Sequence, residues 1–197
     1  TSARALAAPT AAVLMTGLGT SHALAQEEVP GIFSSFEVPK TDLAPFPKWL
    51  GAKAKAEEEM AKFDPNCAPT EVNPCGINAW TNKIESLKGV PLLEQLQAVN
   101  DYLNQAQYVV DMINWGVKDY WSSPGEFFTR FGDCEDYAIA KFLTLRQLGV
   151  PSKNMRIVVL QDQSLNVAHA VLAVYLADRI LVLDNQIPQV IPEQSIL

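Results

Sequence analysis

The segment RFGDCEDYAIAKF, residues 130–142, places one cysteine among three carboxylates. Asp133 and Glu135 flank Cys134, and Asp136 follows one position later. A thiolate is a nucleophile for acyl transfer, and the start of a helix favours it because unpaired backbone N–H groups point there. Nearby carboxylates oppose ionisation of the thiol. The three acids therefore need an explanation of their own.

Two later runs have the period-two alternation of β-strands. They are VAHAVLAVYL (167–176) and RILVLDN (179–185), which a tight turn would join. A two-residue turn pairs Asp184 with Val171, which sets Asp184 diagonally beside His169 on one face of the sheet. At that position a carboxylate can hold an imidazole N–H.

The first 25 residues have the pattern of a secretory leader. They contain one early cation, Arg4, then a central apolar stretch, and Ala23-Leu24-Ala25 at the end. The apolar stretch is shorter than the roughly 18–20 residues of a membrane helix, so we predict a non-spanning chain with a mature domain at 26–197 in the periplasm. The alternative is an amphipathic N-terminal helix. Removing the leader removes His22.

The cysteines fall into a pair and a single residue. Cys67 and Cys75 bracket the segment CAPTEVNPC, whose prolines and asparagine suit a turn, and we predict a disulfide there in an oxidising compartment. Cys134 is then left over, and an unpaired cysteine in an exported protein is a liability unless it is buried or used. A zinc site with three cysteines and His169 would require the pair to be reduced, which the predicted export disfavours.

The mature chain therefore retains one unpaired cysteine and one histidine. Cys134, His169 and Asp184 would form a triad for acyl transfer through a thioester, in which the histidine takes the thiol proton and the acid fixes its tautomer. The alternative is a buried structural cysteine and a strand histidine satisfied by a backbone group. Asp184 lies on the same face of the sheet as His169 in the predicted register, and this favours the triad.

Periodicity predicts the elements that would position these residues. Four helices are predicted at 46–63, 77–89, 91–103 and from Asp133 to Gly149, and three strands at 155–161, 167–176 and 179–185. Helices followed by antiparallel strands define an α+β fold. Few residues follow Asp184, and we expect another strand or turn to complete the sheet. The sequence therefore leaves the C-terminal boundary of the domain undetermined.

An aromatic segment at 114–132 separates the helices and contains Trp115 and Trp121. In a segment broken by Gly and Pro, these rings either wall a substrate cleft or cap the core. The 197 residues fit one domain, and a net charge of −7 without a Lys/Arg cluster argues against a nucleic-acid partner.

Three motifs together resemble the bacterial transglutaminase-like cysteine proteinases, a family that contains the LapG-type periplasmic adhesin proteases. They are GDCEDYAIAKF at 132–142, HAVL at 169–172 and VLDN at 182–185. The resemblance implies a papain-like, transglutaminase-like core, with the nucleophile-bearing helix packed on an antiparallel sheet. It also implies Cys134 as nucleophile, His169 as general base and then acid, and Asp184 as the orienting carboxylate.

The resemblance also gives the acids a role. Asp133 and Glu135 match carboxylates that bind calcium in LapG-type enzymes, and Asp136 is a third candidate ligand. Calcium takes six to eight oxygens, so three acids with loop carbonyls form a partial cage. The alternative is that Asp133 caps the helix and that Glu135 and Asp136 are first-turn acids favoured by the helix dipole.

These features predict a periplasmic, calcium-dependent cysteine endopeptidase. For LapG-type members the resemblance implies cleavage of a large surface adhesin, a step in biofilm regulation, under control of an inner-membrane receptor for cyclic di-GMP. Two alternatives stay open. The same triad would serve a transglutaminase or amidase, and a non-catalytic periplasmic binding module would use only the aromatic cleft.

Overall fold

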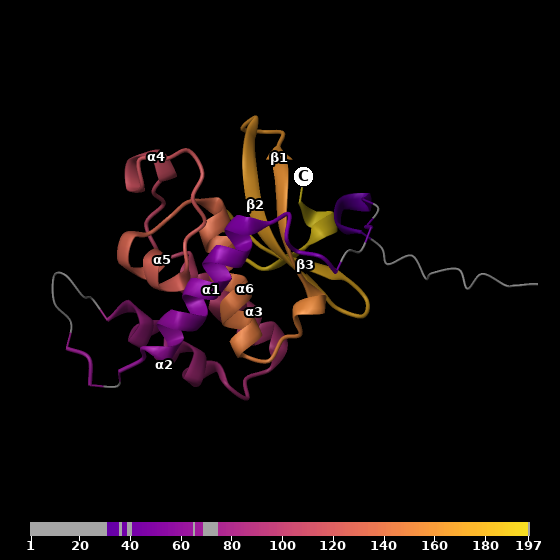
Figure 1. The fold of residues 1–197 in the computed structure, drawn as a ribbon. Helices are drawn as coiled ribbons and strands as arrows, with labels where there is room; N and C mark the ends of the chain where they lie inside the picture. Colours follow the sequence, from indigo (N-terminus) through magenta and orange to yellow (C-terminus); the bar gives the residue numbers. More distant parts are fainter. Residues whose placement is uncertain (1–30, 36, 39–40, 65, 69–74, 197) are drawn as a thin grey trace, which may run out of the picture.

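The computed structural model describes residues 31–35, 37–38, 41–64, 66–68 and 75–196 (Figure 1). The predicted leader, residues 1–25, lies outside the described residues. None of the helices in the described ranges combines the length and hydropathy that crossing a bilayer requires.

Helices form the N-terminal part and strands the C-terminal part, so the α+β prediction is confirmed. The α-helices are α1 (Pro47–Ala61), α2 (Gly76–Leu87), α3 (Leu92–Leu103), α4 (Asp111–Asn114), α5 (Pro124–Arg130) and α6 (Cys134–Gln147). The strands are β1 (Met155–Asp162), β2 (Val167–Tyr175), β3 (Ile180–Leu183) and β4 (Ile191–Pro192). Short 3-10 turns are η1 (Ile32–Ser34), η2 (Ser152–Asn154) and η3 (Glu193–Ser195). The four strands form one antiparallel sheet in the order β1-β2-β3-β4.

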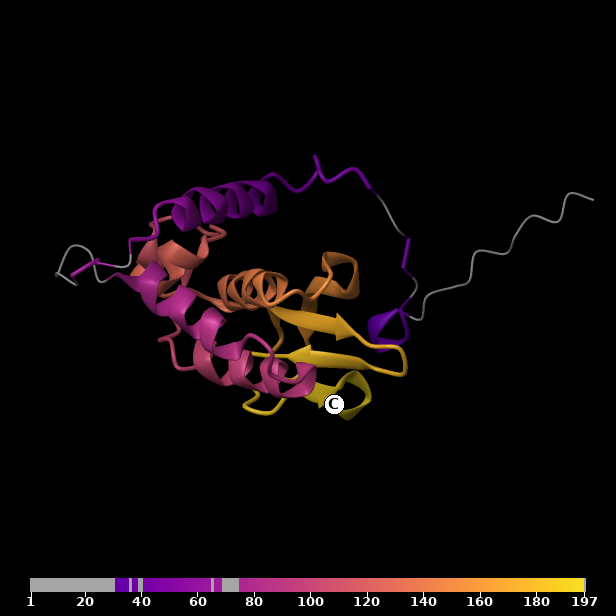
Figure 2. The same ribbon diagram turned by 90° about the horizontal axis from the view of Figure 1, so that it is seen from below.

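Helix α6 is the centre of the molecule. Figure 2 shows it between α1 on one side and the sheet on the other, and 11 of its 14 residues are buried. Trp49 of α1 meets Phe142 edge-on with ring centroids 5.0 Å apart. The helix ends at Gln147, and Gly149 follows with a φ of +97° that suits a residue without a Cβ and allows Val150 N–H to donate to the Leu145 carbonyl. Burial on all sides fixes the position of its first residue, Cys134.

The two faces of the sheet pack against different partners. Leu172 and Val174 join the main core with α6, whereas Val171 and Ala173 belong to a second cluster. Ile32 of η1 packs into that second cluster. The 3-10 turns η1 and η3 lie side by side next to this outer face (Figure 1).

The pairing of β2 with β3 has the predicted register. Tyr175 pairs with Ile180 and Leu172 with Leu183, and Leu176 N–H donates to the Arg179 carbonyl at 2.9 Å across the turn. Continuing the register places Asp184 opposite Val171.

Two segments are more regular than the sequence indicated. Residues 114–132, expected to be loop-like, contain α5, which starts with a capping box: Ser123 N–H donates to Glu126 Oε2 at 3.0 Å and Glu126 N–H donates to Ser123 Oγ at 3.3 Å. The signal was the spacing Ser-Pro-Gly-Glu, which is a helix start. Beyond Asp184, Ile191–Pro192 forms the short strand β4, which pairs with β3.

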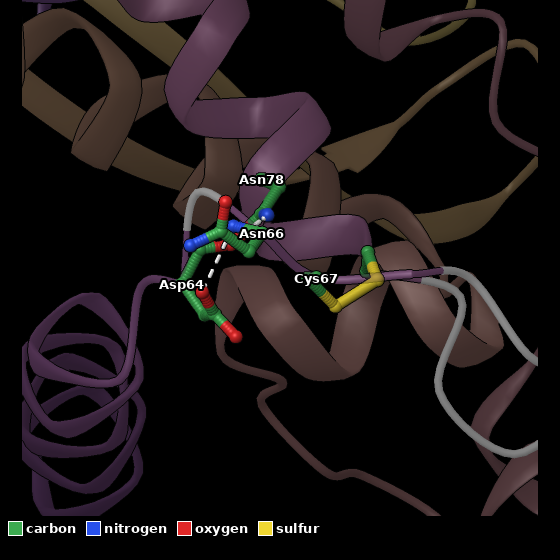
Figure 3. Close-up of a disulfide and its surroundings, with 5 residues drawn as sticks. Asp64, Asn66, Cys67 and Asn78 are labelled. Atoms are coloured by element: carbon green, nitrogen blue, oxygen red, sulfur yellow. Dashed lines mark hydrogen bonds between the residues drawn. A yellow bond between two sulfur atoms is a disulfide. The ribbon is translucent and has the colours of Figure 1, made fainter.

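Cys67 and Cys75 form a disulfide with their Cα atoms 6.1 Å apart (Figure 3). Cys75 immediately precedes α2, and Asn78 in the first turn of α2 donates through Nδ2 to the Asp64 carbonyl. Asn66 N–H also donates to Asp64 Oδ1 at 2.9 Å. These contacts tie the end of α1 to the start of α2.

Candidate active site

Cys134 is the first residue of α6 and is 9% exposed. Its Sγ–H donates to Glu135 Oε2 at 3.2 Å, and the backbone N–H of Ala170, next to His169 in β2, acts to lower the pKa of the thiol. Cys134 and His169 line one cavity of about 330 Å³. The start of α6 therefore places the thiol beside the histidine-bearing strand.

His169 and Asp184 are joined by a hydrogen bond of 2.9 Å between Nε2 and Oδ1, and both side chains are buried. Burial raises the pKa of the Asp184 carboxyl, but hydrogen bonds from His169 and from Gln186 N–H outweigh burial and lower the pKa below its ordinary value. An ionised Asp184 fixes the proton of His169 on Nε2. Nδ1 is then free to accept a proton, and Gln186 Nε2 lies 3.5 Å from it.

The surroundings of Cys134 hold its proton in place. Burial, followed by the charge of Glu135 and its hydrogen bond, raises the pKa of the thiol to about 12, with a further contribution from Asp133. The N–H of Ala170 acts in the opposite direction. The acids flanking Cys134 thus oppose its ionisation, as the sequence suggested.

The acids themselves are crowded. Burial raises the pKa of Asp133 to about 7, with Glu135 contributing through a hydrogen bond and its charge. Burial also raises the pKa of Asp136 to about 8, although a hydrogen bond from Ser122 N–H opposes the shift. Uncompensated negative charge of this kind is costly unless a proton or a cation neutralises it.

Two acids that sequence reasoning missed extend this cluster. Asp111 at the start of α4 groups with Asp133 and Asp136, and Asp119 groups with Asp111 and Glu135, with oxygen atoms within 4.8 Å of one another in each group. Asp111 Oδ1 and Asp133 Oδ1 are buried without a hydrogen-bond partner among the described residues. Asp111 starts the four-residue helix α4 and Asp119 lies in a loop, so neither residue belongs to a periodic pattern that could connect it to Cys134.

This donor set fits a calcium ion. Calcium binds carboxylate oxygens at about 2.3–2.6 Å, so ligand oxygens up to about 5 Å apart can share one ion. The groups around Asp133 meet that spacing, and the two orphaned oxygens are acceptors that a cation would satisfy.

Asp136 also has a structural role. Its Oδ1 accepts from Ser122 N–H at 2.7 Å and its Oδ2 from Asp133 N–H at 3.3 Å. A Cβ on Gly132 would lie 2.1 Å from Asp136 Oδ2, so only glycine permits this close approach. Asp133 is the N-cap residue of α6 and forms a capping box with Asp136, as the alternative interpretation expected, while Asp133 Oδ1 has no hydrogen-bond partner among the described residues.

Of the two tryptophans predicted for a substrate cleft, the structure places one at the cavity. Trp121 lines it, whereas Trp115 lies outside it and stacks on Tyr120 with ring centroids 4.3 Å apart. Tyr108 also lines the cavity, is half-exposed, and stacks on Tyr137 of α6. Tyr108 was not predicted as a cleft residue because it lies outside the aromatic segment at 114–132, in the connection between two helices.

A thiol at the start of a buried helix, in one cavity with a histidine of the adjoining antiparallel sheet that is hydrogen-bonded to an aspartate, is typical of the transglutaminase-like class of cysteine proteases. Residues 63–195 match the sequence profile of the bacterial transglutaminase-like cysteine proteinases. The chain belongs to this family, and it is a cysteine protease.

Solved structures agree with this family. The chain is 35% identical to calcium-bound LapG from Legionella pneumophila, over 73% of this chain and 77% of that one, with a TM-score of 0.59. An EGTA-treated structure of the same LapG matches at 35% identity over 72% and 75% of the two chains, with a TM-score of 0.58. A search of the curated proteins finds no match.

Proposed function

We propose that this protease is a calcium-dependent endopeptidase that cleaves an exported protein with Cys134, His169 and Asp184. The observation that carries the proposal is the 2.9 Å hydrogen bond between His169 and Asp184, beside a cavity that His169 shares with Cys134. The three residues occupy the motif positions that the family resemblance implies.

The geometry supports a thioester mechanism. His169 accepts the Cys134 proton at Nδ1, and the sulfur attacks the substrate carbonyl carbon. The Cys134 N–H at the start of α6 is directed toward the resulting oxyanion. His169 then returns the proton to the leaving amine, and a water activated by His169 hydrolyses the thioester. Asp184 stabilises the imidazolium throughout.

Calcium would be held by oxygens of Asp111, Asp119, Asp133 and Glu135, with Asp136 a further ligand candidate. When bound, the ion supplies positive charge that neutralises the acids which raise the pKa of Cys134. Glu135 is the key residue, because its carboxylate accepts the thiol hydrogen bond. The calcium-bound form of the similar LapG supports this proposal.

A surface adhesin is the substrate class that the LapG-type resemblance supports, and an inner-membrane cyclic di-GMP receptor is the corresponding regulator. The Cys67–Cys75 disulfide supports a periplasmic location, since disulfides persist in oxidising compartments. The leader-like residues 1–25 support the same location.

The test is direct. The purified chain, with calcium or with chelator, is incubated with periplasm-facing fragments of surface adhesins, and new termini are sequenced. We expect cleavage with calcium, little with chelator, and none by Cys134→Ala, which should keep the wild-type fold by circular dichroism. Cleavage by that variant would refute the triad. Cross-linked products in place of cut chains would instead support the transferase alternative.

A matched pair of variants tests the calcium ligands. Asp133→Asn should abolish calcium binding in isothermal titration, because it removes a charge from the cluster. Asp101→Asn is the control: Asp101 is an exposed acid of α3 that bonds Gln97 at 2.7 Å and should leave calcium binding unchanged. Equal calcium binding by both variants would contradict the proposed site.

A further inference from the structure

A second cavity, of about 520 Å³, lies on the outer face of the sheet and borders two of the three proposed catalytic residues, His169 and Asp184. It is larger than the cavity of about 330 Å³ that contains Cys134, and its volume falls within the range of about 300–1,000 Å³ that is usual for ligand pockets. His169 lines both cavities. The proposed general base therefore separates the nucleophile from a second hollow, which we call the outer-face cavity.

The walls of the outer-face cavity are largely apolar. Leu160 and Val171 contribute from neighbouring strands of the sheet, and Ile187 contributes from the segment after β3. Ile196 and Phe33 complete the apolar lining. Phe33 is 40% exposed, so its ring is accessible at the surface. A hollow of this kind favours a side chain that gains by leaving water.

Two segments from opposite ends of the chain close one side of the cavity. Phe33 lies in η1 and Ser195 in η3, and the two turns are neighbours (Figure 1). Phe33 N–H donates to Glu193 Oε2 at 2.5 Å. Ile32 is buried against the outer face of the sheet. The wall that contains Phe33 is therefore anchored to the body of the domain.

The charged side chains among the described residues of this lining are both acids. Asp184 accepts hydrogen bonds from His169 and from Gln186 N–H. Asp162 Oδ1 accepts from the N–H groups of Ser164 and Leu165 at 2.8 and 2.9 Å. An acidic side chain that entered the cavity would meet negative charge without a cationic partner in its walls.

We propose that the outer-face cavity is a substrate subsite, which binds a bulky apolar side chain of the polypeptide close to the scissile bond and disfavours acidic side chains. The substrate is the occupant because the cavity borders His169. An extended chain advances by only about 3.3–3.6 Å per residue, so residues close to a bond held at Cys134 reach the far side of His169. This inference rests on the proposed triad, and it makes Phe33 a specificity-determining residue.

A peptide library tests the subsite without an identified substrate. The calcium-loaded full chain is incubated with peptides of mixed sequence, and the cut sites are read by mass spectrometry. We expect one position near the cut at which Leu, Ile or Phe is favoured over Ala by about tenfold, the lower end of what an apolar pocket contributes to discrimination. Asp and Glu should be depleted at that position.

Two variants should move this preference in opposite directions. Phe33→Ala enlarges the cavity and should shift the preference toward larger, aromatic side chains. Ser195→Trp fills the cavity from an exposed position and should remove the preference for Leu over Ala. Phe63→Ala is the matched control, because Phe63 is 38% exposed and lies outside the lining of both cavities, so the cleavage profile should stay that of the wild type.

The outcomes separate this inference from the proposed function. Cleavage with no apolar preference at any position, or with a preference that neither Phe33→Ala nor Ser195→Trp changes, would overturn the subsite and leave the triad intact. Cleavage that persists in Cys134→Ala, or no cleavage by the wild type, would contradict the proposed function instead.

Photocrosslinking then tests the subsite without catalysis. Alanine peptides that carry one photoreactive leucine are irradiated with the Cys134→Ala chain, and the crosslinked residues are mapped by mass spectrometry. We expect crosslinks at Phe33 or Ile196. Crosslinks found only outside the outer-face cavity would refute the subsite.

Discussion

At the scale of single residues, the site combines a proton held tightly on Cys134 with a base kept ready on His169. Glu135 accepts the thiol hydrogen bond, and Asp184 fixes the imidazole tautomer. The two carboxylates therefore have opposite effects, one retaining the proton of the nucleophile and the other preparing its acceptor. A cation at Glu135 would shift this balance toward the thiolate.

The orienting role of Asp184 predicts different results for two substitutions. Asp184→Ala removes the acceptor for His169 Nε2–H, and we expect kcat for adhesin-fragment cleavage to fall by roughly 10²–10⁴-fold, the usual contribution of general acid–base catalysis. Asp184→Asn keeps an amide oxygen there, as in Cys-His-Asn proteases, and should retain much more activity. Equal losses in both variants would show that charge, rather than the hydrogen bond, is what His169 requires.

The sequence predicted part of this site and missed the rest for physical reasons. Cys134, His169 and Asp184 follow from motif and strand parity, which are local properties. Asp111 and Asp119 reach the site because of the way that irregular segments fold. Such segments have no periodic pattern in the sequence. Lys141 is fully buried in α6 and its Nζ has no hydrogen-bond partner among the described residues, which no periodic pattern predicted.

At the scale of elements, α3 holds the segment that follows β3. Asn100 Nδ2 donates to the carbonyls of Ile187 and Pro188 at 3.1 and 2.9 Å, and Asn104 Nδ2 donates to the Asp184 carbonyl at 2.8 Å. Asn100 is fully buried. The backbone around Asp184 is thus anchored to a helix rather than to a neighbouring strand.

Asn100→Ala should loosen that anchor. The Ile187 and Pro188 carbonyls each lose one of two donors, since Asn104 Nδ2 at 3.5 Å and Gln97 Nε2 at 2.8 Å remain, so we expect a loss of about 0.5–1.5 kcal/mol in the free energy of unfolding. Chemical denaturation measures the loss, and kcat should fall more than KM rises because Asp184 is less well held. Asn114→Ala, which removes an exposed donor to the Phe131 carbonyl, is the control. Greater destabilisation by the Asn114 variant would contradict the anchoring role.

Helices and strands with a periodic pattern of apolar residues were predicted correctly. A short helix whose start depends on a capping box was missed. The amphipathic helices α1–α3 and the strands β1–β3 were predicted from spacing alone. Helix α5 was missed because its seven residues are too few for a period, and its start depends on Ser123 and Glu126. Strand β4, only two residues long, is defined by its pairing with β3.

At the scale of the whole molecule, the nucleophile helix is enclosed between α1 and the sheet, so charge near its start cannot be relieved by moving the helix (Figure 2). Neutralisation must come from a proton or from a cation. Stability and calcium binding are therefore expected to depend on pH together.

The direction of that dependence follows from the two most shifted carboxyls. In the calcium-free fold the pKa values of Asp133 and Asp136 are about 7 and about 8, against an ordinary value of 3.8. The folded chain then binds protons more tightly than the unfolded chain. Their stabilising contribution is complete below pH 3.8 and is lost as the pH rises through about 7 and 8.

Calcium should replace the lost protons, so the increase in melting temperature on adding calcium is expected to be small at pH 5 and larger at pH 8. Differential scanning calorimetry of the chelator-stripped and calcium-loaded chain at both pH values measures it. Comparing the chelator-stripped and calcium-loaded forms at each pH removes the contribution to the melting temperature of carboxyls that titrate alike in both forms. Asp133→Asn should show no increase in melting temperature on adding calcium at pH 8, because it is expected not to bind the ion. A calcium effect that is equal at the two pH values would show that the acids around Cys134 are neutralised in some other way.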